Sequence, residues 1–287
     1  MESMRDIKRR INSVKNTQKI TKAMKMVAAA KLRKAQDKAE DARPFFQKTR
    51  EIINDVTLYT DETQHPLMSE KDGNRHLYIV INSDRGLCGS YNSKVIEKAN
   101  ESFESDEEVS LIVLGRNARD FFKKRNYNIV SEYIGIEDYP SYWFARKISE
   151  EVISLFKEDI VDEVSLVYTH FNSAISQLVK VISLLPLTKI KEPETNNDNG
   201  HQVDYIYEPS ADQVFDILLP KYINNILYST LLEAKASEFG ARMTAMDSAT
   251  DNAGELIDEL TLLYNRARQA AITKELSEIV GGAEALK

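Results

Sequence analysis

The residues with the clearest potential for chemistry lie in a turn at positions 83–92, with the sequence SDRGLCGSYN. An apolar run at 76–82 precedes the turn and predicts a buried strand, and the segment 92–100 predicts a helix. A strand, a glycine-bearing turn and a helix begin many nucleotide-binding sites, because a helix N-terminus attracts phosphate. The turn also holds the only cysteine of the chain, Cys88. Phosphate binding and thiol chemistry are therefore the two hypotheses to test.

The glycine spacing of this turn does not match the phosphate-binding motifs. A P-loop needs two glycines five apart, followed by Lys and then Ser or Thr. Here Gly86 and Gly89 are three apart and precede a serine and a tyrosine. A dinucleotide fingerprint needs a third glycine and an acidic residue at the end of the next strand. The third glycine is missing, and the next predicted strand is followed by Gly115 and Arg116.

The other reactive groups in the turn also have simpler interpretations. Cys88 has no histidine nearby in sequence that could act as its base. Asp84, at a strand end beside glycine, is more typical of a turn former than of a catalytic carboxylate. The four histidines are scattered, so a metal site is not expected. A nucleotide-binding enzyme therefore stays a minor hypothesis, which ATP binding or hydrolysis by the isolated chain would support.

Bulk composition predicts a protein without a membrane span or a disulfide. No apolar run approaches the roughly 20 residues that a bilayer span needs, and no apolar signal core follows Met1. A single cysteine fits a reducing compartment. Net charge is −7 overall, yet residues 1–50 hold 15 Lys and Arg against 5 Asp and Glu. Such a cationic segment predicts an anionic partner, although a solvated helix face is the alternative.

The chain divides into two helical ends and a mixed middle. Apolar residues recur at steps of three and four from 7 to 56, with Ile20, Met24 and Val27 in the predicted seam, as a coiled coil requires. The segment from 210 to 280 is also helix-favouring, with a kink or local loosening expected at Pro220. In between, strands are predicted at 76–82, 110–114, 129–134, 164–170 and 178–185, with helices at 92–104, 116–125 and 141–158. Alternating strands and helices predict a mainly parallel sheet with helices on its faces.

Several long segments resemble the gamma subunit of F-type ATP synthases of the bacterial type. The similarity covers both termini and landmarks in the middle, so it spans the whole chain. The segments are NTQKITKAMKMVAAAKLRKAQ at 16–36, SDRGLCG at 83–89, LLPL at 184–187, YIYEP at 205–209, ASEFGARMTAMDSATDN at 236–252 and LYNRARQAAITKELSEIV at 263–280. Blocks in the right order identify a family far more specifically than a short motif does.

The resemblance implies a long antiparallel coiled coil of the two terminal helices with an inserted Rossmann-like α/β domain. The expected domains are 1–58, 74–208 and 209–287. The implied function is that of a rotor shaft, which couples ion-driven rotation of the c-ring to conformational changes of the catalytic beta subunits. The subunit itself would be non-catalytic and would need no cofactor or metal. Its implied partners are the alpha, beta, epsilon and c-ring subunits, with delta in the same assembly, and no nucleic acid.

The resemblance also carries residue roles. An acidic segment of the beta subunits is expected to contact the first helix, and a loop of one beta subunit the last helix. The matching beta-contact positions are Met24, Lys25, Lys31, Arg33, Lys34, Arg242, Arg268, Gln269 and Thr273. The turn would face the shaft through Asp84, Arg85, Gly86, Cys88 and Gly89. The c-ring and epsilon contacts match Tyr205, Tyr207 and Glu208.

Each of these residues also has a structural alternative. Met24 could pack in the helix seam, Arg268 and Gln269 could be exposed polar positions, and Glu208 could cap a helix. At the level of the whole chain, the main alternative is a coiled-coil protein that binds nucleic acid or acts as an adaptor. No transit peptide is visible, so the expected location is peripheral, on the cytoplasmic side of a bacterial plasma membrane, with membrane association only through the complex.

Overall fold

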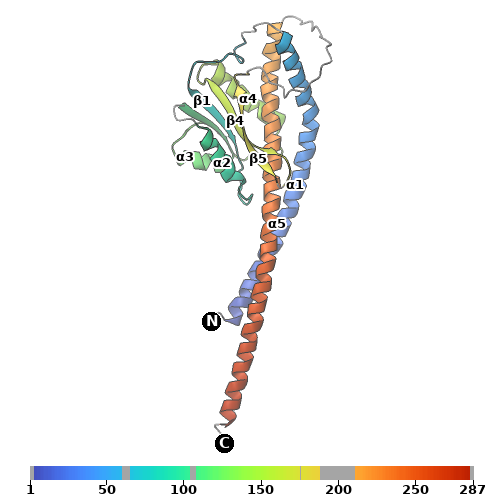
Figure 1. Ribbon diagram of the computed structural model, residues 1–287, viewed down its shortest axis with the longest axis vertical. Helices are drawn as coiled ribbons and strands as arrows, with labels where there is room; N and C mark the ends of the chain where they lie inside the picture. Colours follow the sequence, from blue (N-terminus) through green and yellow to red (C-terminus); the bar gives the residue numbers. More distant parts are fainter. Residues whose placement is uncertain (1–2, 60–64, 104–107, 175, 188–210, 285–287) are drawn as a thin grey trace. The chain divides into compact units, whose positions relative to one another are not determined.

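The computed structural model describes residues 3–59, 65–103, 108–174, 176–187 and 211–284 (Figure 1). The helices are α1 (Met4–Tyr59), α2 (Tyr91–Ser102), α3 (Arg116–Lys123), α4 (Tyr142–Lys157) and α5 (Ala211–Glu284), and the strands are β1 (Arg75–Ile81), β2 (Glu108–Leu114), β3 (Asn128–Tyr133), β4 (Glu163–Phe171) and β5 (Gln177–Leu185). The predicted elements are confirmed, with ends that differ by a few residues. Both α1 and α5 continue through their prolines, Pro44 and Pro220, each as one helix.

The strands form one sheet in the order β3-β2-β1-β4-β5. The pairs β1–β2, β1–β4 and β2–β3 are parallel, whereas β5 pairs with β4 in the antiparallel direction. The mainly parallel sheet expected from the sequence is thus confirmed, with one antiparallel strand at its edge. The strand order reverses between β1 and β4, and that reversal is where doubly wound folds usually bind a ligand.

Alternation along the strands divides the core into two layers. On β1, Leu77, Ile79 and Ile81 face one side of the sheet, and Tyr78 and Val80 face the other. The first side is covered by α4 and α5, and the second side by α2 and α3. The inserted domain is therefore a three-layer sandwich whose outer layer includes part of a terminal helix.

The chain contains two compact units, Met1–Ala28 with Arg242–Lys287, and Ala29–Ala241. Both terminal helices contribute to both units, so the unit boundaries fall inside the helices and not between them. The three predicted segments, 1–58, 74–208 and 209–287, stay a prediction. In the first unit α1 and α5 run antiparallel: Lys25 pairs with Asp247, and Thr250 donates its hydroxyl to Thr21 at 2.8 Å.

The helix seam of the first unit uses smaller residues than the apolar pattern predicts. On α1 the buried positions of this unit are Ile7, Thr21 and Ala28, which are separated by fourteen and seven residues. The predicted seam residues Ile20 and Val27 are instead 60% and 55% exposed, so that part of the prediction is wrong. Thr21 and Ala28 each lie one position after a predicted seam residue, so the buried face of α1 is rotated by roughly 100° from the predicted one. Met24 is half-buried beside the seam.

An ion pair fastens the starts of β1 and β4 at the edge of the sheet opposite the turn. Arg75 donates from Nε to Asp162 Oδ2 at 2.9 Å and from a terminal nitrogen to Oδ1 at 2.6 Å. Its backbone N–H also donates to this carboxylate, at 3.0 Å. Hydrogen bonding to Arg75 lowers the pKa of Asp162, although burial of the carboxyl opposes that shift. Two-pronged pairs of this kind are among the stronger polar contacts.

Because the pKa of Asp162 is lowered in the folded chain, the unfolded chain binds its proton more readily. The stability that the pair contributes is therefore present above the ordinary pKa of about 3.9 and is lost as pH falls. We expect urea unfolding to show a free energy that drops below about pH 4. Asp162→Asn should reduce this pH dependence, whereas Asp120→Asn, at an exposed carboxylate, should leave it unchanged. Equal slopes for Asp162→Asn and the unaltered chain would contradict the assignment.

Candidate interaction site at the carboxyl edge of the sheet

The cysteine of the turn is enclosed within it. Cys88 is 1% exposed, and its sulfur accepts a hydrogen bond from Asn92 Nδ2 at 3.3 Å. Ser83 Oγ lies 4.0 Å from the same sulfur. A thiol that fills a turn in this way is not accessible to a substrate, so the geometry gives Cys88 a packing role.

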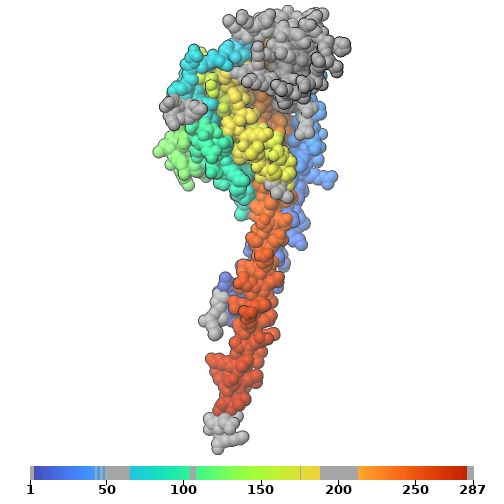
Figure 2. Space-filling model, viewed as in Figure 1, coloured from blue at the N-terminus to red at the C-terminus, as the bar shows by residue number. Residues whose placement is uncertain are grey.

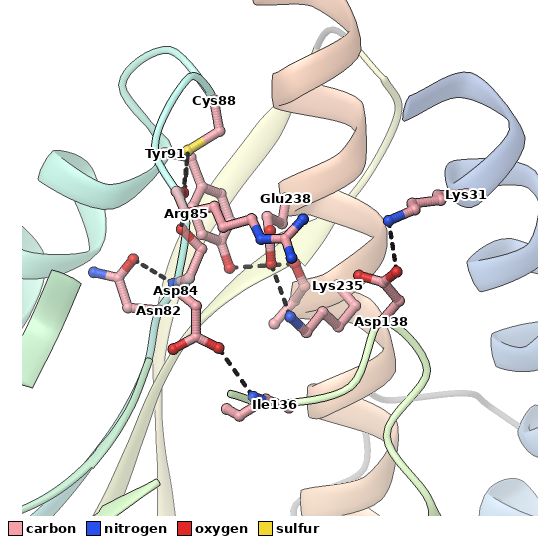
Figure 3. Close-up of polar contacts among 12 residues, drawn as sticks. Lys31, Asn82, Asp84, Arg85, Cys88, Tyr91, Ile136, Asp138, Lys235 and Glu238 are labelled. Carbon is pink, nitrogen blue, oxygen red and sulfur yellow. Dashed lines mark hydrogen bonds and ion pairs between the residues drawn. The ribbon is translucent and has the colours of Figure 1, made fainter. Parts of the chain in front are cut away.

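Asp84 joins three loops at the carboxyl edge of the sheet. One carboxylate oxygen accepts the backbone N–H of Arg116 at 3.1 Å, where α3 begins. The other accepts the backbone N–H of Ile136 at 2.9 Å, in the loop after β3 (Figure 3). Since both oxygens are used inside the domain, Asp84 acts as a tie between loops that are distant in sequence, and not only as a local turn former.

Two positions at this edge have a left-handed backbone that constrains their residue type. Gly115 has φ +95°, and a Cβ there would lie 2.5 Å from the carbonyl oxygen of Asn82. Leu87 has φ 60° and is 64% exposed. A large apolar residue held outward in that conformation is unusual.

Helix α5 occupies the crevice where a nucleotide-binding fold would place its ligand. Tyr91, the first residue of α2, donates its hydroxyl to the carbonyl oxygen of Ala234 on α5 at 3.2 Å. Ser237 of α5 donates to the carbonyl oxygen of Thr169 on β4 at 3.0 Å. These bonds span the switch between β1 and β4. The site that the turn resembles is therefore filled by the chain itself.

A buried ion pair of α5 faces the same crevice. Lys235 and Glu238 are 3.0 Å apart and only 7% and 5% exposed. Figure 3 shows the side chain of Arg85 extending from the turn toward Glu238. Charged groups are almost never this buried unless they are paired, so this contact is specific rather than incidental.

Two further contacts bring α5 close to the end of β4. A Cβ on Gly240 would lie 3.3 Å from the Cα of Ala174, so only a glycine permits this approach without a shift. His170 Nδ1 lies 2.7 Å from Glu233 Oε2. Burial, and then the Glu233 carboxylate, raise the pKa of Tyr168 to about 12. Its hydroxyl stays neutral at ordinary pH.

The loop after β3 contacts the basic face of α1 in the same unit. Lys31 forms an ion pair with Asp138 at 2.5 Å (Figure 3). Lys34 lies 4.7 Å from the centre of the Tyr139 ring, in cation–π geometry. Two of the lysines assigned from the resemblance to a beta contact are thus engaged within the chain. Arg33 is exposed.

The remaining beta-contact candidates lie on the unit formed by the chain ends. Arg268, Gln269 and Thr273 are exposed on α5, and Arg242 is half-buried. Thr273 donates its hydroxyl to the backbone oxygen of Gln269 at 3.0 Å. Apolar residues on the same stretch are also exposed: Leu262, Leu263, Ile272, Leu276, Ile279 and Val280. On the face seen in Figure 2 the end of α5 has no covering segment.

Further features of the described residues bear on metal, membrane and ligand sites. Among them, no group of three His, Cys, Asp or Glu could hold a metal ion, and none of the described helices is long and apolar enough to cross a membrane. A groove of about 1070 Å³ between α2 and α3 is lined by both signs of charge, including Glu97, Glu101, Lys124 and Arg125. The predicted c-ring and epsilon contacts Tyr205, Tyr207 and Glu208 lie outside the described residues.

Paired terminal helices and an α/β insert that contacts each of them define a coiled-coil protein with an inserted α/β domain. Comparison with known proteins agrees. The family model described as ATP synthase matches residues 3–286. The ATP synthase gamma chain of Halothermothrix orenii is 66% identical, and that of Heliobacterium modesticaldum 50% identical, each over the whole of both chains.

Solved structures give the same result for the fold. The central stalk and c-ring structure of Tetrahymena thermophila mitochondrial ATP synthase contains a chain with 26% identity and a TM-score of 0.61, over 80% of this chain and 99% of that chain. A chain in the Euglena gracilis enzyme has a TM-score of 0.70 at 19% identity, over 99% of this chain and 94% of that chain. The chain belongs to the ATP synthase gamma chain family. It is the central shaft of a rotary enzyme complex.

Sequence reasoning missed the residues that hold the insert to the helices. Asp138, Tyr139 and Lys235 carried no motif, because their partners are distant in sequence. The one available signal was Glu238, a charged residue three positions after Lys235 in a segment otherwise rich in small and apolar residues. A Lys–Glu pair in such a segment indicates two charges that are buried together and neutralise each other. The sequence does not identify which part of the chain covers the pair.

Asp84 gives a direct test of the structural role of the turn. Asp84→Ala removes the acceptor for two backbone N–H groups, so we expect a loss of about 1–3 kcal/mol in the free energy of unfolding. Asp120→Ala, at an exposed carboxylate on α3, should cost less than about 0.5 kcal/mol. Urea unfolding measures both. If the two variants were equally stable, Asp84 would not be a tie between the loops.

Proposed function

We propose that this chain transmits rotation between an ion-driven c-ring and the catalytic beta subunits, and that it carries no catalytic site of its own. The observation that carries the second part is the crevice between β1 and β4, which α5 fills. A domain whose ligand site is occupied by its own chain cannot turn over a nucleotide there. The reaction is left to other subunits, and this chain supplies a surface that changes orientation.

The proposed mechanism treats the shaft as a ligand with three orientations. A rigid surface that contacts the beta subunits differently in each orientation shifts their conformations, and hence their nucleotide affinities, by its differential contacts. The exposed apolar and polar side chains near the end of α5 supply such an asymmetric surface. Because the coupling is reciprocal, ATP hydrolysis on the beta subunits would turn the shaft in reverse.

The proposed beta contacts follow the exposure of the candidate residues. Arg268 and Gln269 are exposed and available to a loop of a beta subunit. Arg33 is exposed and suits an acidic lever, since attraction between solvated charges is soft and salt-screened. Lys25 could join that contact only by exchanging Asp247 for another partner. Lys31 and Lys34 could join that contact only by exchanging Asp138 and Tyr139 for another partner. Leu87 adds an apolar tip to the contact proposed for the turn.

The remaining partners are proposed from the resemblance. Tyr205, Tyr207 and Glu208 would form the foot that contacts the c-ring and epsilon, with alpha and delta in the same assembly. The proposed location is the cytoplasmic side of a bacterial plasma membrane, where the chain is held peripherally by the complex. Nucleic-acid binding is disfavoured, because residues 51–287 hold 23 Lys and Arg against 40 Asp and Glu.

Reconstitution tests the proposal as a whole. We expect the chain, mixed with alpha and beta subunits of a close relative, to form a particle with ATPase activity that alpha and beta alone do not sustain. Size-exclusion chromatography followed by a phosphate-release assay measures both. A chain that failed to assemble would overturn the proposed function, and so would ATP hydrolysis by the chain alone.

The end of α5 gives a sharper test of the beta contact. The double variant Arg268→Leu with Gln269→Leu removes two exposed polar groups without a partner in the helix seam, so stability should change by less than about 1 kcal/mol. Assembly or turnover should nevertheless fall clearly. Cys88→Ser, at a buried turn position, serves as the control and should leave turnover nearly unchanged. Normal assembly and turnover in the double variant would show that these residues do not contact a beta subunit.

A further inference from the structure

We infer that the crevice filled by α5 is a torque joint, in which Tyr91 acts as a positioning residue that keeps the insert from turning against the helix under load. This inference rests on the proposed function, because only a rotating shaft loads the joint. It concerns the second compact unit alone, in which the insert, Tyr91 and the contacted part of α5 all lie.

Most of the contact between insert and helix is apolar and resists sliding weakly. Along α5, Phe215, Leu219, Ile223 and Leu227 pack into the core of the sheet. Burial of apolar area is non-directional, so a small slide along such a surface changes its free energy little. A torque between the two parts must therefore be resisted by contacts with a preferred direction.

The directional contacts are concentrated at the carboxyl edge of the sheet. The Tyr91 hydroxyl donates to Ala234, and Ser237 donates to Thr169. Both bonds are buried, and a hydrogen bond weakens steeply as its angle departs from linearity. Movement of α5 past the insert would break both and leave buried polar groups unpaired, which costs more than the bonds themselves contribute. This edge therefore resists shear where the apolar face does not.

The buried pair Lys235–Glu238 lies on the same stretch of α5 as the Tyr91 acceptor, Ala234. The two side chains pair with each other at 3.0 Å within the helix, so they move together with α5. The group that reaches from the insert toward this pair is Arg85, whose side chain extends toward Glu238 (Figure 3). A shift of α5 past the insert would move the Glu238 carboxylate away from the Arg85 side chain.

The insert also holds the second helix, at a separate point. Asp138 pairs with Lys31 of α1, and Tyr139 lies beside Lys34 (Figure 3). If the insert were held at one point only, it could rotate about that point. Contacts at two points, one on each helix, resist rotation of the insert. The carboxyl edge supplies both. This arrangement explains why an otherwise ligand-binding edge is used for helix contacts.

The test compares two tyrosines that differ in what they hold. Tyr91→Phe removes the hydroxyl that bonds α5 and keeps the ring. Tyr78→Phe is the matched control: Tyr78 is also buried and donates to a backbone oxygen, that of Ser102, at 2.7 Å, but inside the insert. Ser237→Ala removes the second bond of the joint and serves as an independent variant should Tyr91→Phe fold poorly.

Hydrogen exchange of the full chain measures the joint directly. We expect Tyr91→Phe and Ser237→Ala to speed exchange of the α5 amides at 233–240 about fivefold, the change that loss of one such bond allows. Tyr78→Phe should leave these amides unchanged. Equal exchange rates at 233–240 in Tyr91→Phe and Tyr78→Phe would contradict the inference that Tyr91 holds α5. This outcome does not depend on how the assembled complex behaves.

Coupling in the assembled ATP synthase measures the consequence. In inverted membrane vesicles, Tyr91→Phe should pump fewer protons per ATP as the proton gradient rises, while hydrolysis with an uncoupler present stays at the unaltered rate. A merely structural loss would lower both in proportion, as expected for Tyr78→Phe. If Tyr91→Phe kept full pumping against a high gradient, the inference would fail. If the unaltered chain restored no pumping, the proposed function would fail, and the exchange comparison would still decide whether Tyr91 holds α5.

Discussion

The structure depends on the burial of α5 from two directions at once. Every position between 222 and 240 is buried or half-buried, because the sheet and α4 lie on one side and α1 contributes Lys31 near Phe239 on another. A helix that is apolar on most sides must be enclosed. Beyond Arg242 the buried positions thin to Met246, Ala253 and Leu260, one every seven residues, and a two-helix seam then suffices.

Enclosure of α5 places this helix at the edge where a doubly wound sheet usually binds its ligand. A doubly wound sheet opens a crevice at its strand reversal, and the helix N-terminus of α2 is directed into it. Here the first residue of α2 is Tyr91, whose hydroxyl donates to Ala234. This hydrogen bond joins the start of α2 to α5. The fold is retained while its binding edge serves a second helix.

Most of the fold could be predicted from the sequence, because periodicity reports local structure and burial. Strands and helices of the insert were expected within a few residues, and so were both long helices. The predicted seam was wrong at Ile20 and Val27, since pattern alone favours large apolar residues while close helix contact selects Thr21 and Ala28. The turn could be excluded as a phosphate site from its glycine spacing, but its tie through Asp84 depends on residues 32 and 52 positions away.

Charge was interpreted only in part, for the same reason. The cationic first helix predicted an anionic partner, and one such partner lies within the chain, at Asp138 of the acidic insert. Lys31 and Asp138 are 30% and 44% exposed, and pairs at that exposure contribute about 1 kcal/mol or less. So weak a contact can be exchanged for another carboxylate without a large barrier. The pair with Asp138 therefore leaves Lys31 able to bind an acidic surface outside the chain.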